Sequence, residues 1–101
     1  MKVVQPQQEI TLPKLMRMNL HRNISTHYKE FGTFLLLDDT GKRVQNMEHT
    51  FMNSPEYINM EIFREWLDGR GRRPVTWETL VEVLREIELH ILADDIQQAH
   101  I

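Results

Sequence analysis

Hydrophobic residues recur every three or four positions along most of the chain, which is the spacing of helices that each bury one face. Near the carboxyl end, Trp77, Leu80 and Leu84 follow this spacing and predict a helix over Thr76 to Ile87. Pro74 disfavours helix at the residue before it, and threonine is a favoured N-cap residue. These signals predict a helix that begins at Thr76 and turns one apolar face to a core.

The same spacing predicts further helices, and none of the segments between them alternates apolar and polar residues as a half-buried strand does. Their expected ranges are Thr11 to about Leu20, Ser25 to Leu37, Val44 to Phe51, Ser54 or Asn59 to Asp68, and Leu89 to Ala99. The sequence therefore predicts an all-α fold of about six short helices in one bundle.

Glycines and prolines interrupt the apolar pattern and predict how the helices end. Gly69 is expected to end the fourth helix in a left-handed cap, and the Asp38-Asp39-Thr40-Gly41 segment is expected to form a turn. Gly32 is an exception because it lies inside the second expected helix, where glycine costs about 1 kcal/mol relative to alanine. We expect either close packing against Gly32 or a bend of the helix there.

Composition sets the size and setting of this fold. The chain has 101 residues, of which 41% are hydrophobic, and these numbers suit one domain with a modest core. We expect residues 1–9, which are polar and contain a proline, to form a flexible tail, and residues 10–101 to form the bundle. The absence of cysteine, of a long apolar run and of an apolar leader segment favours a soluble cytoplasmic protein without disulfides.

Charge is distributed unevenly along the chain. The net charge is −3. Residues 1–75 carry 11 Lys or Arg and 9 Asp or Glu, for +2, whereas residues 76–101 carry 1 and 6, for −5. A polarised small domain of this kind favours association with proteins more than binding to nucleic acid, for which a basic face should dominate.

Residue patterns of catalytic and metal sites do not occur in the sequence. The five histidines lack the HExxH spacing or another compact ligand spacing, and no glycine-rich loop precedes a Lys-Ser or Lys-Thr pair. No serine lies in a nucleophile elbow, and the aspartate turn lacks the ligand pattern of an EF-hand. We therefore expect a protein that is not an enzyme and that has no cofactor or metal.

The carboxyl-terminal half resembles a death domain. The resemblance is based on a tryptophan at the end of a helix (Trp66), a glycine-containing loop, Thr76 at the start of the next helix, and the pattern Leu89-x-x-Leu92-Ala93-x-x-Ile96. The segment Tyr28-x-x-Phe31-Gly32-x-x-Leu35 is similar in placement to the first half of that fold, so the resemblance covers roughly Thr11 to Ala99. The chain lacks the tryptophan that many members carry in their second helix, where Tyr28 is the nearest aromatic residue.

The resemblance implies a six-helix antiparallel Greek-key bundle that acts as an adaptor in apoptotic or innate-immune signalling. Its partner would be a death-fold domain of the same or another protein. Association between copies of the same protein would give homo-oligomers. In such domains one contact joins the end of the fourth helix and the following loop to the region of the fifth and sixth helices. The residues at these positions are Asp68, Arg70, Arg72 and Arg73 on one side, and Glu86, Glu88, His90, Asp94 and Asp95 on the other.

The charge pattern leads to a compatible hypothesis without the resemblance. If the basic loop and the acidic face point apart in one molecule, they can pair between molecules head to tail. Simpler interpretations remain open: Glu78, Glu82 and Glu86 are often just a solvated helix face, and the arginines can be solubilising. A domain that docks one partner helix in a groove, and a nucleic-acid module that grips phosphates with Gly69 to Arg73, are the alternative functions.

Overall fold

Most of the described residues lie in helices. The computed structural model describes residues 10–37, 41–71 and 73–101, and within these ranges no residue lies in a strand. The α-helices are α1 (Leu12–Arg17), α2 (Leu20–Ile24), α3 (Tyr28–Leu36), α4 (Lys42–Thr50), α5 (Pro55–Leu67), α6 (Trp77–Glu86) and α7 (His90–His100), and the 3-10 helix η2 (Ser25–His27) joins α2 to α3. The all-α prediction is confirmed. The expected tail at residues 1–9 and most of the expected turn at residues 38–40 lie outside the described residues.

Helix starts follow the sequence signals closely. Thr76 caps α6 by accepting a hydrogen bond from the backbone N–H of Thr79 at 3.1 Å. Thr11 caps α1 in the same way, with a longer bond of 3.4 Å from Lys14. The first expected helix, Thr11 to about Leu20, ends earlier, at Arg17, and a separate helix α2 begins at Leu20. The break occurs because Asn19 adopts a left-handed conformation with φ of 58°. Asparagine tolerates that conformation better than most residues, so it can reset the direction of the chain.

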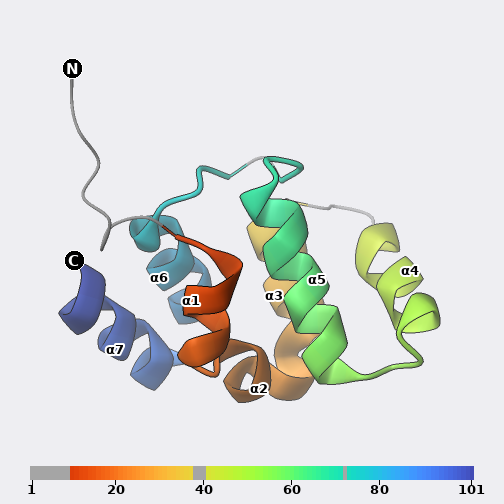
Figure 1. The fold of residues 1–101 in the computed structure, drawn as a ribbon, viewed down its shortest axis with the longest axis horizontal. Helices are drawn as coiled ribbons and strands as arrows, with labels where there is room; N and C mark the ends of the chain where they lie inside the picture. Colours follow the sequence, from red (N-terminus) through yellow and green to blue (C-terminus); the bar gives the residue numbers. More distant parts are fainter. Residues whose placement is uncertain (1–9, 38–40, 72) are drawn as a thin grey trace.

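Helix α5 occupies the middle of the bundle and contacts α1, α2, α3 and α4 (Figure 1). Helix α3 also packs against α6, and α6 packs along α7 with the two helices running in opposite directions. Helices α4 and α7 lie at opposite ends of the longest axis, along which the molecule extends 41 Å. None of the described helices is both long and apolar enough to cross a bilayer.

The core is built from the apolar stripes that the sequence predicts. Trp66 is fully buried and Trp77 is 3% exposed, so both tryptophans are core residues as expected. Phe31 of α3 meets Phe63 of α5 edge to face, with ring centroids 5.2 Å apart. The aromatic pair therefore joins the two helices that make the central contact of the bundle.

Asn59 is buried inside α5, where its side chain connects this helix to the bend between α2 and η2, and it does not begin a helix. The sequence left Ser54 and Asn59 as alternative N-caps, and the structure places the N-cap at Ser54, with Pro55 first in α5. The side-chain amide of Asn59 instead donates 3.0 Å hydrogen bonds to the carbonyls of His21 and Ser25. Ser25 has a positive φ of 50°. The amide therefore satisfies backbone groups at the sharp bend between α2 and η2, where no helix can satisfy them.

Gly32 lies where side chains of α4 and α5 pack closely against α3. A Cβ atom built on Gly32 would lie 2.6 Å from Cγ2 of Val44 and 2.9 Å from Cδ1 of Ile62. Side chains from α4 and α5 therefore occupy the space that any other residue at position 32 would need. Of the two expectations for this glycine, close packing is the one that the structure supports.

We expect Gly32→Ala to lower the free energy of unfolding by about 1–2 kcal/mol. Overpacking costs about 1–3 kcal/mol, and the better helix propensity of alanine offsets about 1 kcal/mol of that. Chemical denaturation followed by circular dichroism measures the change. Glu30→Ala, at an exposed position of the same helix, is the matched control and should change stability by less than about 0.5 kcal/mol. A Gly32→Ala protein as stable as the wild type would contradict the close packing.

Candidate functional site

The segment from Asp68 to Thr76, called the arginine loop below, is fixed against two helices by its first half. Gly71 lies against the end of α3, where an added Cβ would meet Leu36 at 3.2 Å. Arg43 of α4 donates a 3.0 Å hydrogen bond to the carbonyl of Arg70. Gly69, with φ of 79°, ends α5 in the left-handed conformation that the sequence predicts. The described residues at the start of the loop are therefore held in place by α3 and α4.

Arg73 pairs with the acidic face inside the same molecule. Its guanidinium lies 3.2 Å from the Glu86 carboxylate and 3.8 Å from that of Glu82, and only 20% of its side chain is exposed. Arg73 therefore does not extend freely into solvent, because α6 passes close enough for its glutamates to hold the arginine. Partly exposed pairs contribute about 0–1 kcal/mol each, so their main effect here is to orient the loop.

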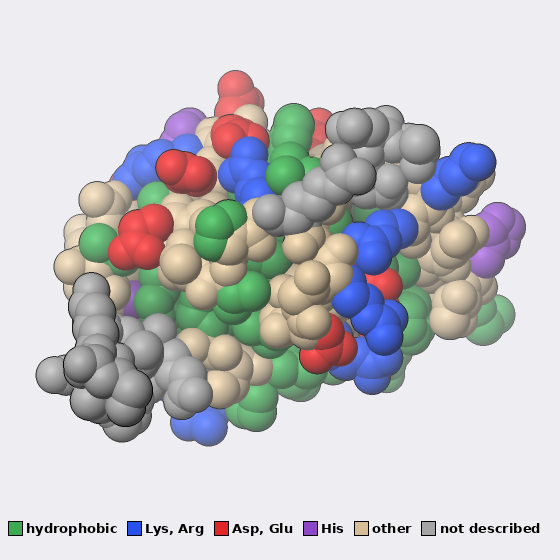
Figure 2. Space-filling view, turned by 90° about the horizontal axis from the view of Figure 1, so that it is seen from above, with side chains coloured by type: hydrophobic (Ala, Val, Ile, Leu, Met, Phe, Trp, Pro, Cys, Tyr) green, Lys and Arg blue, Asp and Glu red, His purple; other side chains and the backbone are tan. Residues whose placement is uncertain are grey.

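Two further charged residues at the start of the loop are exposed. Asp68 is the C-cap of α5 and is exposed, and the Arg70 side chain is exposed as well. Arg72 lies outside the described residues. Seen from the side that carries the loop, Lys and Arg side chains gather in a band toward the end formed by α4 and α5, and acidic side chains are more frequent toward the α6 and α7 end (Figure 2). The polarity of the sequence is thus also a polarity in space.

The opposite charge lies around the turn between α6 and α7. This region, called the acidic end below, comprises the residues Glu86, Glu88, His90, Asp94 and Asp95. Glu88, His90 and Asp95 are exposed, and no ion pair within the described residues involves them. Asp94 is different, because Arg85 holds it at 2.9 Å. The free charge of the acidic end is therefore concentrated in Glu88 and Asp95.

Glu88 occupies a position where the fold favours glycine. Helices α5 and α6 end in the same hydrogen-bond pattern, in which Arg70 N–H bonds to Glu65 C=O at 3.0 Å and Leu89 N–H bonds to Leu84 C=O at 2.8 Å. The left-handed residue in this motif is Gly69 after α5, but it is Glu88, with φ of 66°, after α6. A left-handed residue with a side chain costs about 1–2 kcal/mol. The sequence thus places a charged side chain where the backbone alone would favour glycine.

A shallow apolar depression lies beside Glu88 at the start of α7. It has a volume of about 640 Å³ and is lined by Asn23, Glu88, Leu89, His90, Ile91, Leu92 and Asp95. The side chain of Ile91 is 79% exposed, whereas the core side of α7 is formed by Ala93 and Ile96. The depression therefore combines an apolar surface with an acidic rim.

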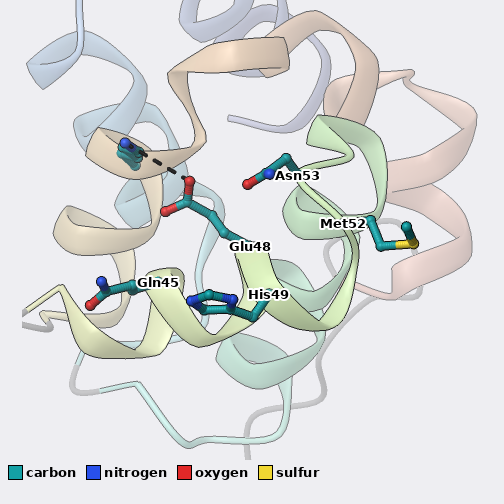
Figure 3. Close-up of a pocket in the computed structure, with 6 residues that line it drawn as sticks. Gln45, Glu48, His49, Met52 and Asn53 are labelled. Atoms are coloured by element: carbon teal, nitrogen blue, oxygen red, sulfur yellow. Dashed lines mark ion pairs between the residues drawn. The ribbon is translucent and has the colours of Figure 1, made fainter.

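A second depression, between α3 and α4, is polar (Figure 3). Its central group is Glu48, which accepts a 3.0 Å hydrogen bond from the Tyr28 hydroxyl and lies 3.9 Å from the Lys29 ammonium. Burial of Tyr28 raises the pKa of its phenol above the usual value of 10.0, and the hydrogen bond and negative charge of Glu48 raise it further. These contacts join α3 to α4. The cluster of Tyr28, Lys29 and Glu48 therefore has a structural role in the fold.

Sequence reasoning missed several residues that shape these surfaces. Arg43 and Glu82 hold the arginine loop, but no local pattern links either of them to it. Ile91 could have been recognised, because it falls outside the apolar stripe of Leu89, Leu92 and Ile96. In the described parts of the chain, no three His, Asp or Glu side chains gather as metal ligands do.

We expect the raised pKa of Tyr28 to make the wild-type fold sensitive to alkaline pH. The folded state favours the protonated phenol, so the stabilisation is fully present below about pH 10 and is lost as pH rises through the raised pKa. Thermal unfolding at about pH 8 and about pH 11 should show a larger loss of stability for the wild type than for Tyr28→Phe. Equal losses in the two proteins would contradict the pKa shift.

Comparisons with known proteins do not assign this arrangement. No family model, curated protein or solved structure matches the chain.

Proposed function

We propose that this chain is a non-catalytic protein-interaction domain of the death-fold type, which associates with the same or a related death-fold domain. The one observation that carries the proposal is the separation of two surfaces on one small bundle. A fixed loop presents Arg70, and Glu88 and Asp95 are exposed beyond the far end of α6. Arg73 and Glu86 pair within the molecule, but no ion pair in the described residues joins Arg70 to Glu88 or Asp95. A second molecule can therefore pair with these groups.

The proposed Greek-key arrangement is supported by the helix order and packing. Counting α1 and α2 as the two parts of one divided helix, the order of helices corresponds to the six that the resemblance implies. Helix α3 packs against both α5 and α6 and so joins the amino-terminal helices to the α6–α7 pair. By the same resemblance, we place the domain in cytoplasmic apoptotic or innate-immune signalling.

The geometry weakens the nucleic-acid alternative. A phosphate-gripping loop needs arginines that are free to meet a polyanion. Arg73 is instead held by Glu82 and Glu86, and these carboxylates would repel a phosphate backbone next to the loop. The proposed protein contact uses Arg70 without having to break the Arg73 pairs.

We expect Arg70→Glu to weaken association strongly while the fold stays intact. The substitution places negative charge opposite the acidic end of the partner, and the Arg70 side chain is exposed. Sedimentation velocity over a concentration series, at low and physiological salt, measures the association, and salt should weaken that of the wild type. Because the partner of Arg43 is the backbone carbonyl of Arg70, the loop keeps that anchor.

Arg17→Glu is the matched control for this experiment. Arg17 is exposed on α1, outside both proposed surfaces, and its substitution changes the net charge by the same amount. Unchanged association of Arg17→Glu with loss in Arg70→Glu would locate the contact at the loop. Equal effects of the two substitutions would show that only net charge matters and would contradict the proposal.

We expect Glu88→Gly to stabilise the monomer and weaken association at the same time. Glycine adopts the left-handed backbone conformation without the energetic cost that a residue with a side chain has there. The free energy of unfolding should therefore rise by about 1 kcal/mol. The carboxylate is lost from the acidic end in the same step. Glu88→Gln loses the charge but keeps the backbone cost, so it should weaken association without the gain in stability. Full association of both variants would exclude Glu88 from the contact.

A further inference from the structure

The turn between α4 and α5 carries the most exposed of the large apolar side chains in the described parts of the chain. Met52 is 87% exposed, and Figure 3 shows its side chain pointing away from Glu48. Its φ is 53°, and that of Asn53 is 61°. Left-handed backbone is unfavourable for a residue such as methionine, although asparagine tolerates it better. The fold therefore holds an apolar side chain out in solvent in a conformation that the backbone does not favour.

An aromatic stack adjoins Met52 at the same turn. Tyr57, in the first turn of α5, is 58% exposed and stacks on Phe51 with ring centroids 6.3 Å apart. Phe51 in turn packs against the core, so the stack loses little conformational freedom when a partner covers it. Methionine makes favourable contacts with aromatic rings. The turn thus provides both halves of one contact, a protruding methionine and an aromatic surface that can receive one.

The charged groups around this turn include both signs side by side. Arg22 of α2 lies 3.3 Å from Glu56 of α5, and Lys29 of α3 lies 3.9 Å from Glu48 of α4. The Arg22, Glu56 and Lys29 side chains are each more than half exposed. A strongly acidic or strongly basic partner would meet repulsion at one member of each pair. The surface instead fits a partner that also places a positive group next to a negative one.

We propose that this turn pairs with the same turn of a second copy about a two-fold axis. In such an isologous contact one patch forms both sides, so it has to be complementary to itself. Met52 of each copy lies on the Phe51–Tyr57 stack of the other, and Arg22 of each faces Glu56 of the other. An apolar centre inside a charged rim is the usual organisation of a protein interface. The contact stops at a dimer, because the two-fold axis leaves neither patch free.

This contact is separate from the arginine loop and the acidic end. The turn precedes α5 and the arginine loop follows it, and a helix of 13 residues separates its two ends by about 20 Å. Helix α7 lies at the other end of the longest axis from α4 (Figure 1). The inference therefore adds a second surface to the proposed function, and either of the two can fail without the other.

The first test uses Met52→Ser in the Arg70→Glu background, where the proposed contact of the arginine loop is blocked. Sedimentation velocity of Arg70→Glu over a concentration series should show monomers and dimers and no larger species. Adding Met52→Ser should weaken the dimer at least about tenfold, because both sides of the contact lose a side chain. Dimers that are equally strong with and without Met52 would overturn the inference.

A mixture of the two chains tests the two-fold symmetry. A mixed dimer of Arg70→Glu with Arg70→Glu/Met52→Ser lacks one of two equal contacts. Its dissociation constant, corrected for the two ways of forming a mixed dimer, should therefore rise by about the square root of the full factor, or about threefold for a tenfold loss. Fluorescent labelling of one chain makes the mixed dimer measurable. A mixed dimer as weak as the dimer of two Met52→Ser chains would contradict the two-fold contact.

Ile91→Ser is the matched control, because Ile91 is 79% exposed and lies on α7. In the same background it removes a comparable apolar side chain from the surface, and dimerisation should stay unchanged. A loss equal to that of Met52→Ser would attribute association to exposed apolar surface in general and overturn the inference.

Cross-linking provides a test that does not remove the contact. The chain has no cysteine, so an introduced cysteine carries the only thiol. A short bismaleimide should join Met52→Cys into a covalent dimer, because a two-fold contact places a central residue next to its own counterpart. Ile91→Cys should cross-link at least about tenfold more slowly, since its thiols meet only by free diffusion. Equal rates at the two positions would overturn the inference.

Discussion

The position of the arginine loop depends on the close contact at Gly32. Val44 of α4 and Ile62 of α5 both enter the space beside this glycine, so the contact sets how α4 and α5 lie against α3. The same three helices then meet the loop, because α5 ends at it, α3 supports Gly71 through Leu36, and α4 supplies Arg43. A Cβ atom at position 32 would have to displace the side chains of Val44 and Ile62, which belong to two of these helices. Core packing and the proposed contact surface are therefore linked through one residue.

Two features distinguish the arginine loop and the acidic end from ordinary solvent-exposed surface. The arginine loop is held by side chains and backbone from α3, α4 and α6, although a solubilising loop needs no such support. At the other end, Glu88 occupies a left-handed position that a glycine fills at the equivalent end of α5. Departures from what the backbone favours often mark positions kept for binding. The loop precedes α6 and Glu88 follows it, and the Arg73 pair with Glu86 connects the two regions along the same helix.

Much of the fold could be predicted because its signals are local. Thr76 begins α6, Gly69 ends α5, and both tryptophans are buried as their apolar stripes indicate. The Arg73 pairs with Glu82 and Glu86 could not be predicted, since they depend on how the loop runs back along α6. Asn59 was ambiguous for a similar reason, because its partners belong to α2 and η2. Local patterns thus specified the helices and the exposed charges, whereas tertiary packing decided which charges stay free for a partner.

The central claim is that one copy uses its arginine loop and the next copy uses its acidic end. An NMR dilution series of the isotope-labelled wild-type chain tests it most directly, because every backbone amide reports its own surroundings. The account predicts that amides near Arg70 and amides near Glu88 and Asp95 shift together with concentration and with one common binding constant. Shifts confined to the turn around Met52, or shifts on only one of the two surfaces, would contradict it.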